Sequence, residues 1–287
     1  MIGEALLKGV EAGERCVRRQ FRYASCEACI GICPTQALSW KEGIPAVDSD
    51  RCVMCASCLF VCPTEAIEGA EPEPRFFRGH TLVAPFSIIA PTTEELLFWH
   101  VEHHIRAVAM DPLCNPQWML AIARLNLRLR AYGQPEWTFS PPAQSEINDS
   151  RRALFHARRE KTASARIQPG LRRWRRLWPL MSDFQLAVDT QKCTLCGACW
   201  RACAQKSLAF DEHELRIEDT QCTGCGACTA VCVYQALTLT SATSRSGSQR
   251  FTASESRCAC CQKSFWSLNT NEKRCLFCQR HAHGMRK

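Results

Sequence analysis

Cysteine content is the feature of this 287-residue chain that most limits its fold. The chain holds 22 cysteines, and all but Cys16, Cys114 and Cys260 fall into five tight groups. Within these groups the cysteines form C-x2-C units, a spacing that suits a shared metal better than a framework of long-range disulfide bridges. We therefore predict that the grouped cysteines are metal ligands and that the fold is organised around their sites.

Four of the five groups form a long-range internal repeat. The second copy contains two four-cysteine runs, "CTLCGACWRAC" from residue 193 and "CTGCGACTAVC" from residue 222. When the first copy is shifted by 170 residues, its seven cysteines superpose on cysteines of the second copy without a gap. The remaining pair is Tyr23 against Cys193, so one position of the first copy lacks a thiol.

Each copy resembles the bacterial two-cluster ferredoxin family, whose runs are spaced C-x2-C-x2-C-x3-C-P. The resemblance implies a small βαββαβ domain with two [4Fe-4S] clusters, in which the fourth cysteine of each run binds the cluster of the other run. It implies three complete ligand sets and one incomplete set. The complete sets are Cys193, Cys196, Cys199 with Cys232; Cys222, Cys225, Cys228 with Cys203; and Cys52, Cys55, Cys58 with Cys33. The incomplete set is Cys26, Cys29 and Cys62.

Three hypotheses address the vacancy opposite Cys193. Cys16 lies upstream in "ERCVRRQFRYASC", and the loop between Cys16 and Cys26 is long enough to fold back and supply a thiolate. Alternatively, the site holds a labile or three-iron cluster, or takes Tyr23 or another oxygen ligand. Cys16 would then be a structural thiol in a degenerate site. If Cys16 is the ligand, we expect Tyr23 to pack beside the cluster.

The second copy departs from the family pattern after its fourth cysteines. Pro34 and Pro63 follow the fourth cysteines of the first copy, whereas Ala204 and Val233 stand there in the second. Because proline turns the chain but does not bind iron, we expect ligation in the second copy to be preserved.

The fifth cysteine group lies near the C-terminus. In "CACCQKSFWSLNTNEKRCLFC", Cys258 and Cys261 form one C-x2-C knuckle and Cys275 and Cys278 form another. Two such knuckles resemble a zinc ribbon, in which four thiolates hold the metal tetrahedrally. The same soft ligands accept a single iron, so the metal is zinc or iron.

The segment between the copies predicts an α/β spacer. The stretch "HTLVAPFSIIAP" is typical of a buried strand, and "TTEELLFWHVEHHIRAVAMDP" predicts a helix capped by Thr92 or Thr93. A second helix, "NPQWMLAIARLNLRLRAYG", has Pro116 near its start and Gly133 at its end, and "PEWTF" is a candidate strand.

These patterns predict an α+β chain that is divided into six parts. The parts are a first dicluster domain (1–74), the spacer (75–145), a basic helical linker (146–182), a second dicluster domain (183–241), a flexible tether (242–256) and a zinc-ribbon-like tail (257–287).

The charge of the chain carries little information about partners. The formal net charge is +8, but four clusters, each about −2 with its thiolates, would bring the loaded protein near neutrality. This disfavours nucleic acid as a partner. The basic linker is interpreted as a solvated helix, or as a docking surface for an acidic redox protein, RNA or anionic lipid. No stretch has the length and composition of a signal peptide or membrane span, so reduced thiols in the cytoplasm are expected.

The function expected from these features is one-electron transfer. The sequence shows no nicotinamide, flavin or nucleophile motif, which favours a non-catalytic subunit or accessory protein of an oxidoreductase. By family analogy alone, a molybdenum-dependent formate dehydrogenase or a related dehydrogenase is the expected redox partner. The alternative is a regulatory or maturation adaptor that binds nucleic acid or a client enzyme, with structural or sensory clusters.

Overall fold

The chain divides into two compact units. The computed structural model describes residues 9–113, 115–142, 161–170, 173, 176–245 and 247–281. One unit combines Met1–Gly13 with Glu27–Leu177, and the other combines Glu14–Cys26 with Trp178–Lys287. The short segment Glu14–Cys26 therefore belongs to the same unit as the second repeat copy, although it contains the start of the first copy.

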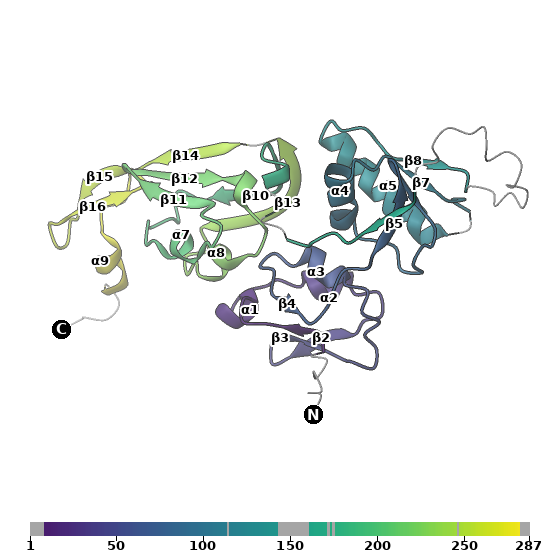
Figure 1. The fold of residues 1–287 in the computed structure, drawn as a ribbon. Coiled ribbons are helices and arrows are strands. Elements are labelled where there is room, and N and C mark those ends of the chain that lie inside the picture. Colours follow the sequence, from purple (N-terminus) through teal and green to yellow (C-terminus); the bar gives the residue numbers. More distant parts are fainter. Residues whose placement is uncertain are drawn as a thin grey trace, which may run out of the picture. The chain divides into compact units, whose positions relative to one another are not determined.

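The first repeat copy consists of two short antiparallel strand pairs and two short helices (Figure 1). β1 pairs with β4, β2 pairs with β3, and the two helices α2 and α3 pack against each other. The resulting order confirms the βαββαβ prediction. The elements are β1 (Glu11–Ala12), α2 (Ala28–Ile32), β2 (Leu38–Lys41), β3 (Ile44–Val47), α3 (Ser57–Val61) and β4 (Ile67–Glu68).

The second copy repeats this arrangement at the same 170-residue offset. α7 and β11 coincide with α2 and β2 at both ends after the shift, and the pairs β10–β13 and β11–β12 match those of the first copy. In β12, Leu215 and Ile217 are buried and their neighbours are not, the period of two expected for a strand with one face on the core. The elements are β10 (Met181–Val188), α7 (Ala198–Ala202), β11 (Leu208–Asp211), β12 (Glu214–Glu218), the 3-10 turn η1 (Asp219–Gln221), α8 (Ala227–Ala230) and β13 (Leu237–Arg245).

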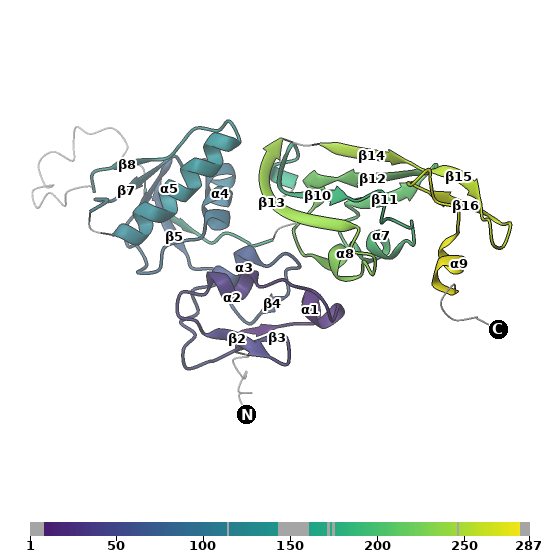
Figure 2. The same cartoon turned by 180° about the vertical axis from the view of Figure 1, so that it is seen from behind.

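The spacer in the first unit is a five-stranded sheet covered by two helices. Its strand order is β8-β7-β6-β5-β9, with β6, β7 and β8 parallel. Because β6, β7 and β8 follow one another in a single direction across the sheet, right-handed crossovers place α4 and α5 on the same face, as both views show (Figures 1 and 2). The elements are β5 (Arg75–Arg78), β6 (Thr81–Val83), α4 (Thr93–Glu102), β7 (Ala107–Ala109), α5 (Pro116–Ala131), β8 (Thr138–Ser140) and β9 (Ala163–Ala165).

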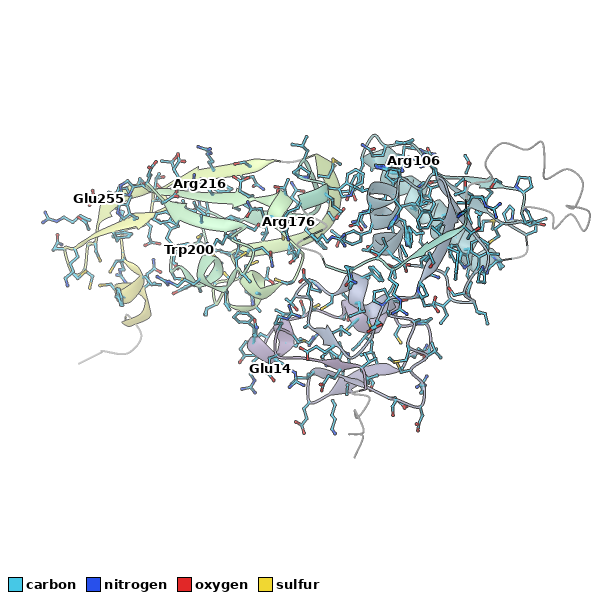
Figure 3. All side chains as sticks on the ribbon, viewed as in Figure 1. Glu14, Arg106, Arg176, Trp200, Arg216 and Glu255 are labelled. Carbon is cyan, nitrogen blue, oxygen red and sulfur yellow. The ribbon has the colours of Figure 1, made fainter. Side chains whose placement is uncertain are left out.

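The spacer helices begin where the sequence predicts, but the first ends earlier. Thr92 caps α4 by accepting a hydrogen bond from the Glu95 N–H, and Asn115 caps α5 with Pro116 in its first turn. α4 ends at Glu102, and His104 then has a positive φ of 52°, a conformation that a helix cannot contain. The last part of the predicted helix is instead the loop and the short strand β7, beside which Arg106 is labelled in Figure 3.

Two of the predicted linking segments are wrong where the structure describes them. In the predicted basic linker, residues 146–160 lie outside the described part, but Ala163–Ala165 forms β9 and pairs with β5. Met181 already belongs to β10. The predicted flexible tether is mostly strand, because β13 extends to Arg245, β14 (Ser248–Thr252) adds to β12, and β15 (Ser254–Arg257) follows directly.

The C-terminal tail is fixed to the second unit by this continuous strand structure. β15 pairs with β16 (Ser264–Ser267), and α9 (Leu276–His281) follows. Trp266 on β16 stacks on His213 from the turn between β11 and β12, with ring centroids 3.8 Å apart. In the part of the chain described by the structure, no helix has the length and apolar composition needed to cross a membrane.

Candidate iron-sulfur sites

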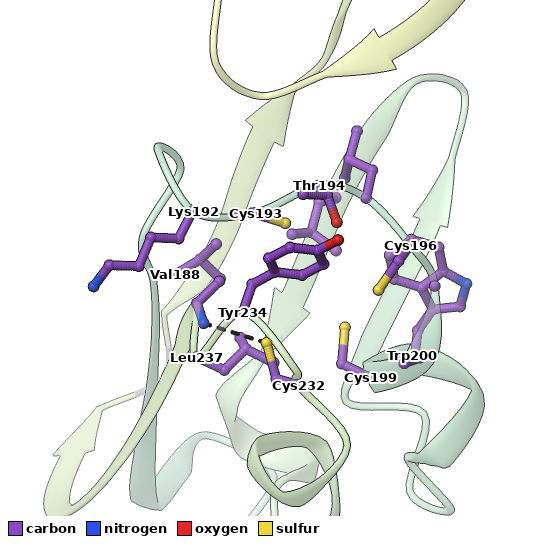
Figure 4. Close-up of a pocket in the computed structure, with 15 residues that line it drawn as sticks. Val188, Lys192, Cys193, Thr194, Cys196, Cys199, Trp200, Cys232, Tyr234 and Leu237 are labelled. Atoms are coloured by element: carbon purple, nitrogen blue, oxygen red, sulfur yellow. Dashed lines mark hydrogen bonds between the residues drawn. The ribbon is translucent and has the colours of Figure 1, made fainter. Parts of the chain in front are cut away.

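One ligand set of the second copy surrounds a single hollow. Cys193 and Cys196 lie in the loop before α7, Cys199 lies in α7, and Cys232 lies in the turn after α8. The hollow comprises about 390 Å³, part of it open to solvent, and Figure 4 shows the four cysteines around it beside Trp200. Burial, and next the thiols of the other three cysteines, raise the pKa of Cys199 to about 12.

A hollow of the same size in the first copy surrounds the set that corresponds, after the 170-residue shift, to Cys203, Cys222, Cys225 and Cys228. It also comprises about 390 Å³ and is lined by Cys33, Cys52, Cys55 and Cys58. Burial, and next the neighbouring thiols of Cys55, Cys52 and Cys33, raise the pKa of Cys58 to about 12. Sequence reasoning placed these four cysteines in one set although Cys33 belongs to a different run.

The third set gathers Cys222, Cys225 and Cys228 with Cys203. Burial, and next the thiols of the other three, raise the pKa of Cys228 to about 12. Cys199 from the first hollow also acts on Cys228, so the two sets of the second copy are neighbours. Soft thiols in fours, partly buried among apolar side chains, are the donor set that an iron-sulfur cluster needs.

A backbone hydrogen bond to the fourth cysteine recurs in all four runs. In each run the N–H four residues later donates to the cysteine Sγ, and the residue between them, three after the cysteine, has a positive φ that closes the turn. Because the bond forms with or without the following proline, Ala204 and Val233 leave the turn intact. The bonds are Ala37 to Cys33 (3.3 Å), Ala66 to Cys62 (3.2 Å), Ser207 to Cys203 (3.3 Å) and Ala236 to Cys232 (3.2 Å).

These hydrogen bonds stabilise negative charge on sulfur. Burial tends to raise the pKa of Cys33, but hydrogen bonds from the Thr35 hydroxyl and the Ala37 N–H outweigh burial, and the pKa is lowered. Donors to a ligand sulfur also raise the reduction potential of a cluster. Sequence reasoning did not predict these backbone hydrogen bonds to sulfur, although the small residue four positions after each fourth cysteine could have indicated them.

The loop of the incomplete site differs in backbone conformation. In the three regular runs, the second residue after the first cysteine and the residue after the second cysteine have positive φ: Met54 and Ala56, Leu195 and Gly197, Gly224 and Gly226. At the position equivalent to Gly197 (φ 83°), Glu27 has φ −135°. The chain at residues 23–29 therefore does not follow the regular loop.

Tyr23 lies outside any packed environment. Its side chain is 77% exposed, and its ring contacts the guanidinium of Arg22 at 5.9 Å. The expectation that Tyr23 packs beside a cluster is wrong. With the altered loop, this exposure argues against Tyr23 as a replacement for the missing thiolate.

The segment Glu14–Cys26 packs on the helices of the second copy. Val17 in α1 (Val17–Gln20) and Ala24 are buried against Ala227 of α8, and Phe21 and Cys26 pack around them. Cys16 is the N-cap residue just before α1, and the Arg18 Nε donates to the Cys26 carbonyl oxygen at 2.5 Å. This bond draws the Cys16–Cys26 loop together. The other two cysteines of this set, Cys29 and Cys62, are buried in the first unit.

Comparison with known families agrees with this geometry. A family model described as a 4Fe-4S dicluster domain matches residues 24–66, and a second model of the same description matches residues 185–233. The chain contains two 4Fe-4S dicluster domains. No curated protein matches the chain significantly. The matched regions begin after Cys16 and end before the C-terminal cysteines.

A separate four-cysteine site lies in the C-terminal ribbon. The sulfur atoms of Cys258, Cys261, Cys275 and Cys278 all lie within 4.8 Å of one another, so the four cysteines grouped in the sequence could hold one metal ion. Backbone N–H groups of Cys261 and Cys275 lower the pKa of Cys258 to about 6 and so favour the thiolate that binds metal. Cys260 is exposed and is not part of this group.

Replacing Cys275 with serine should release the metal of this ribbon without affecting the dicluster domains. The three remaining thiols cannot complete a tetrahedral site, and metal binding supplies folding energy to such small elements. Metal analysis should show the loss of about one zinc or iron ion per chain, with the absorbance of the [4Fe-4S] clusters unchanged. Cys260→Ser is the matched control and should retain the ion. A loss of cluster absorbance in Cys275→Ser would show that these thiols serve a cluster instead.

Proposed function

We propose that this chain is a four-cluster electron-transfer subunit or accessory protein of a larger oxidoreductase. The observation that carries the proposal is the crosswise gathering of cysteines from different runs into sets of four, repeated at a 170-residue offset. Each bound [4Fe-4S] cluster would accept and release one electron at a time. The ligands would be the three complete sets described above, and Cys26, Cys29 and Cys62 with Cys16 at the fourth site.

The protein side chains would set the environment of these clusters. Apolar lining such as Trp200, which stacks on Phe210 at 5.5 Å, limits water near the cysteines. The recurrent N–H donors stabilise the charge on sulfur. The two neighbouring sets of the second domain would allow electrons to pass between clusters within that domain.

The proposed partner is a second redox protein. The family resemblance favours a dehydrogenase subunit, such as that of a molybdenum-dependent formate dehydrogenase, and the many thiols favour the reducing cytoplasm. The ribbon, with zinc or a single iron, would serve as a structural or protein-binding element. Purifying the protein anaerobically with its bound partners would identify the donor or acceptor.

The iron content of anaerobically prepared protein tests the four-cluster assignment. Iron and acid-labile sulfide in the dicluster domains should approach about 16 of each per chain, four for each cluster. An electron carrier should also take up several electrons reversibly at low potential without unfolding. Iron near half that value after reconstitution contradicts the four-cluster assignment, and irreversible reduction favours the alternative of an adaptor with structural or sensory clusters.

A further inference from the structure

A buried ion pair joins the spacer to the cluster site of the first dicluster domain. Arg75 at the start of β5 donates from Nε and Nη2 to the two carboxylate oxygens of Glu95, at 2.8 and 3.1 Å. The side chains are only 7% and 5% exposed. Nη1 also donates to the Ser87 hydroxyl at 2.5 Å and to Glu73 at 3.1 Å. The guanidinium lies 5.5 Å from the Trp118 ring.

Burying the Arg75–Glu95 ion pair costs free energy, so its presence is weak evidence for a purely stabilising role. Removing two charges from water costs several kcal/mol for each ion, and packed apolar residues are often at least as stabilising. The hydrogen bonds of the Arg75 guanidinium fix its orientation, so its charge is held in one place instead of being averaged over rotamers. A fixed buried charge acts strongly on neighbouring groups because little water screens it.

The neighbouring group is the cluster site lined by Cys33, Cys52, Cys55 and Cys58. Helix α3, which carries Cys58, packs against α4, whose first turn carries Glu95. Cys55 lies just before α3 and its thiol interacts with the Ser57 hydroxyl at 3.5 Å. The Arg75 guanidinium is close enough to interact electrostatically with Cys55. The second dicluster domain is followed by β14 instead of a helical layer, so this arrangement belongs to the first domain.

We propose that Arg75 raises the reduction potential of the cluster at Cys33, Cys52, Cys55 and Cys58, and that Glu95 positions its guanidinium. Reduction adds one negative charge to a cluster, so a nearby cation stabilises the reduced state and a nearby anion destabilises it. The spacer thereby sets one cluster of the chain apart from the other three. The proposal rests on the four-cluster function, since it requires a cluster at this site.

Potentiometric titration of the whole protein, followed by electron paramagnetic resonance, tests the proposal with charge-changing variants. Arg75→Gln should lower one of the four midpoint potentials, and Glu95→Gln should raise the same one. Each change should alter the ratio of reduced to oxidised cluster at a fixed potential by on the order of tenfold. Arg75→Lys retains the charge and should stay close to the wild type. Shifts of opposite sign are a result that a merely structural role does not produce.

The exposed pair Arg130–Glu136 provides a matched control. Arg130 donates to both carboxylate oxygens at 2.9 and 3.1 Å, but the side chains are 68% and 41% exposed. Arg130→Gln and Glu136→Gln should leave all four potentials unchanged. Should Arg75→Gln fail to fold, Glu73→Gln at the half-exposed partner still tests the sign and should raise the same potential.

The outcomes separate this inference from the proposed function. Iron content is measured first in every variant, and a wild-type protein that lacks a cluster at Cys55 contradicts the four-cluster function itself. If four clusters are present and neither Glu95→Gln nor Glu73→Gln raises a potential, the role of Arg75 is overturned. A shift of the same sign in Arg75→Gln and Glu95→Gln also overturns it, because it indicates a general disturbance of packing.

Discussion

Cys16→Ala should remove one of the four clusters or convert it to a three-iron cluster. Cys16 and Cys26 lie at the two ends of a loop that the Arg18–Cys26 hydrogen bond draws together, and Cys16 is partly buried there. Without its thiolate, one iron would be held only by water or a weak oxygen ligand and lost on mild oxidation. Iron should fall from about 16 to about 15 or about 12 per chain, and a three-iron cluster has its own paramagnetic resonance signal.

Tyr23→Phe is the matched comparison and should leave all four clusters in place. The phenol is 77% exposed, so its hydroxyl has no packed environment to lose. If Cys16→Ala is silent under mild oxidation while Tyr23→Phe loses iron, the oxygen ligand is native and Cys16 is a structural thiol. The loop conformation also predicts the result of a rescue experiment. In the Cys16→Ala background, Tyr23→Cys together with Glu27→Gly should restore a four-iron cluster at this site. Glycine permits the positive φ of the regular loop.

The packing of the Cys16 segment explains why sequence reasoning left this site open. A C-x2-C-x2-C-x3-C run specifies its own geometry, because the ligand spacing and the turn residues are local. The position of Cys16 depends on Val17 and Ala24 packing against Ala227, more than 200 residues later in the chain. No periodicity or spacing records such a contact, so the sequence could nominate Cys16 but not place it.

The wrong predictions for the linking segments have a similar origin. The stretch "SATSRSGSQRF" is polar and rich in serine, a composition typical of a flexible loop. Nevertheless, β14 pairs along β12 through backbone hydrogen bonds that do not depend on side-chain polarity. Phe251 packs on the core of the second dicluster domain, and the Gln249 side chain donates to the Leu186 carbonyl oxygen at 2.9 Å. An edge strand of this kind is determined by its neighbour more than by its own sequence.

The sequence patterns that predicted local structure correctly are those that the backbone can satisfy in only one conformation. Thr92 caps α4 as predicted, because a side-chain oxygen before a helix has few other backbone N–H groups to reach. The strand β7 was missed because three residues, Ala107–Ala109, are too few to show a period. Nothing in the sequence indicates the role proposed for Arg75, since that role depends on the approach of α3 to α4.

The iron content of double cysteine variants should distinguish two modes of ligation. In crosswise ligation the fourth cysteine of each run binds the cluster of the other run, and in run-wise ligation each run holds its own cluster. Cys232 lies in the hollow with Cys193, although its own run begins at Cys222. If Cys193 and Cys232 hold the same cluster, the double variant Cys193→Ala/Cys232→Ala loses one cluster and retains about 12 irons per chain. Cys222→Ala/Cys232→Ala then removes one ligand from each of two different clusters and should retain about 8 after oxidation and chelation have removed incompletely ligated clusters.

Run-wise ligation predicts the reverse order of these two values, so each double variant is the control for the other. Both variants remove two thiols from the same domain and cost it similar packing, which makes a general loss of stability an insufficient explanation for a difference. The first dicluster domain provides an internal reference, because its clusters should be retained in both proteins. Equal iron contents in the two variants would contradict the assignment, since crosswise and run-wise ligation each predict unequal values.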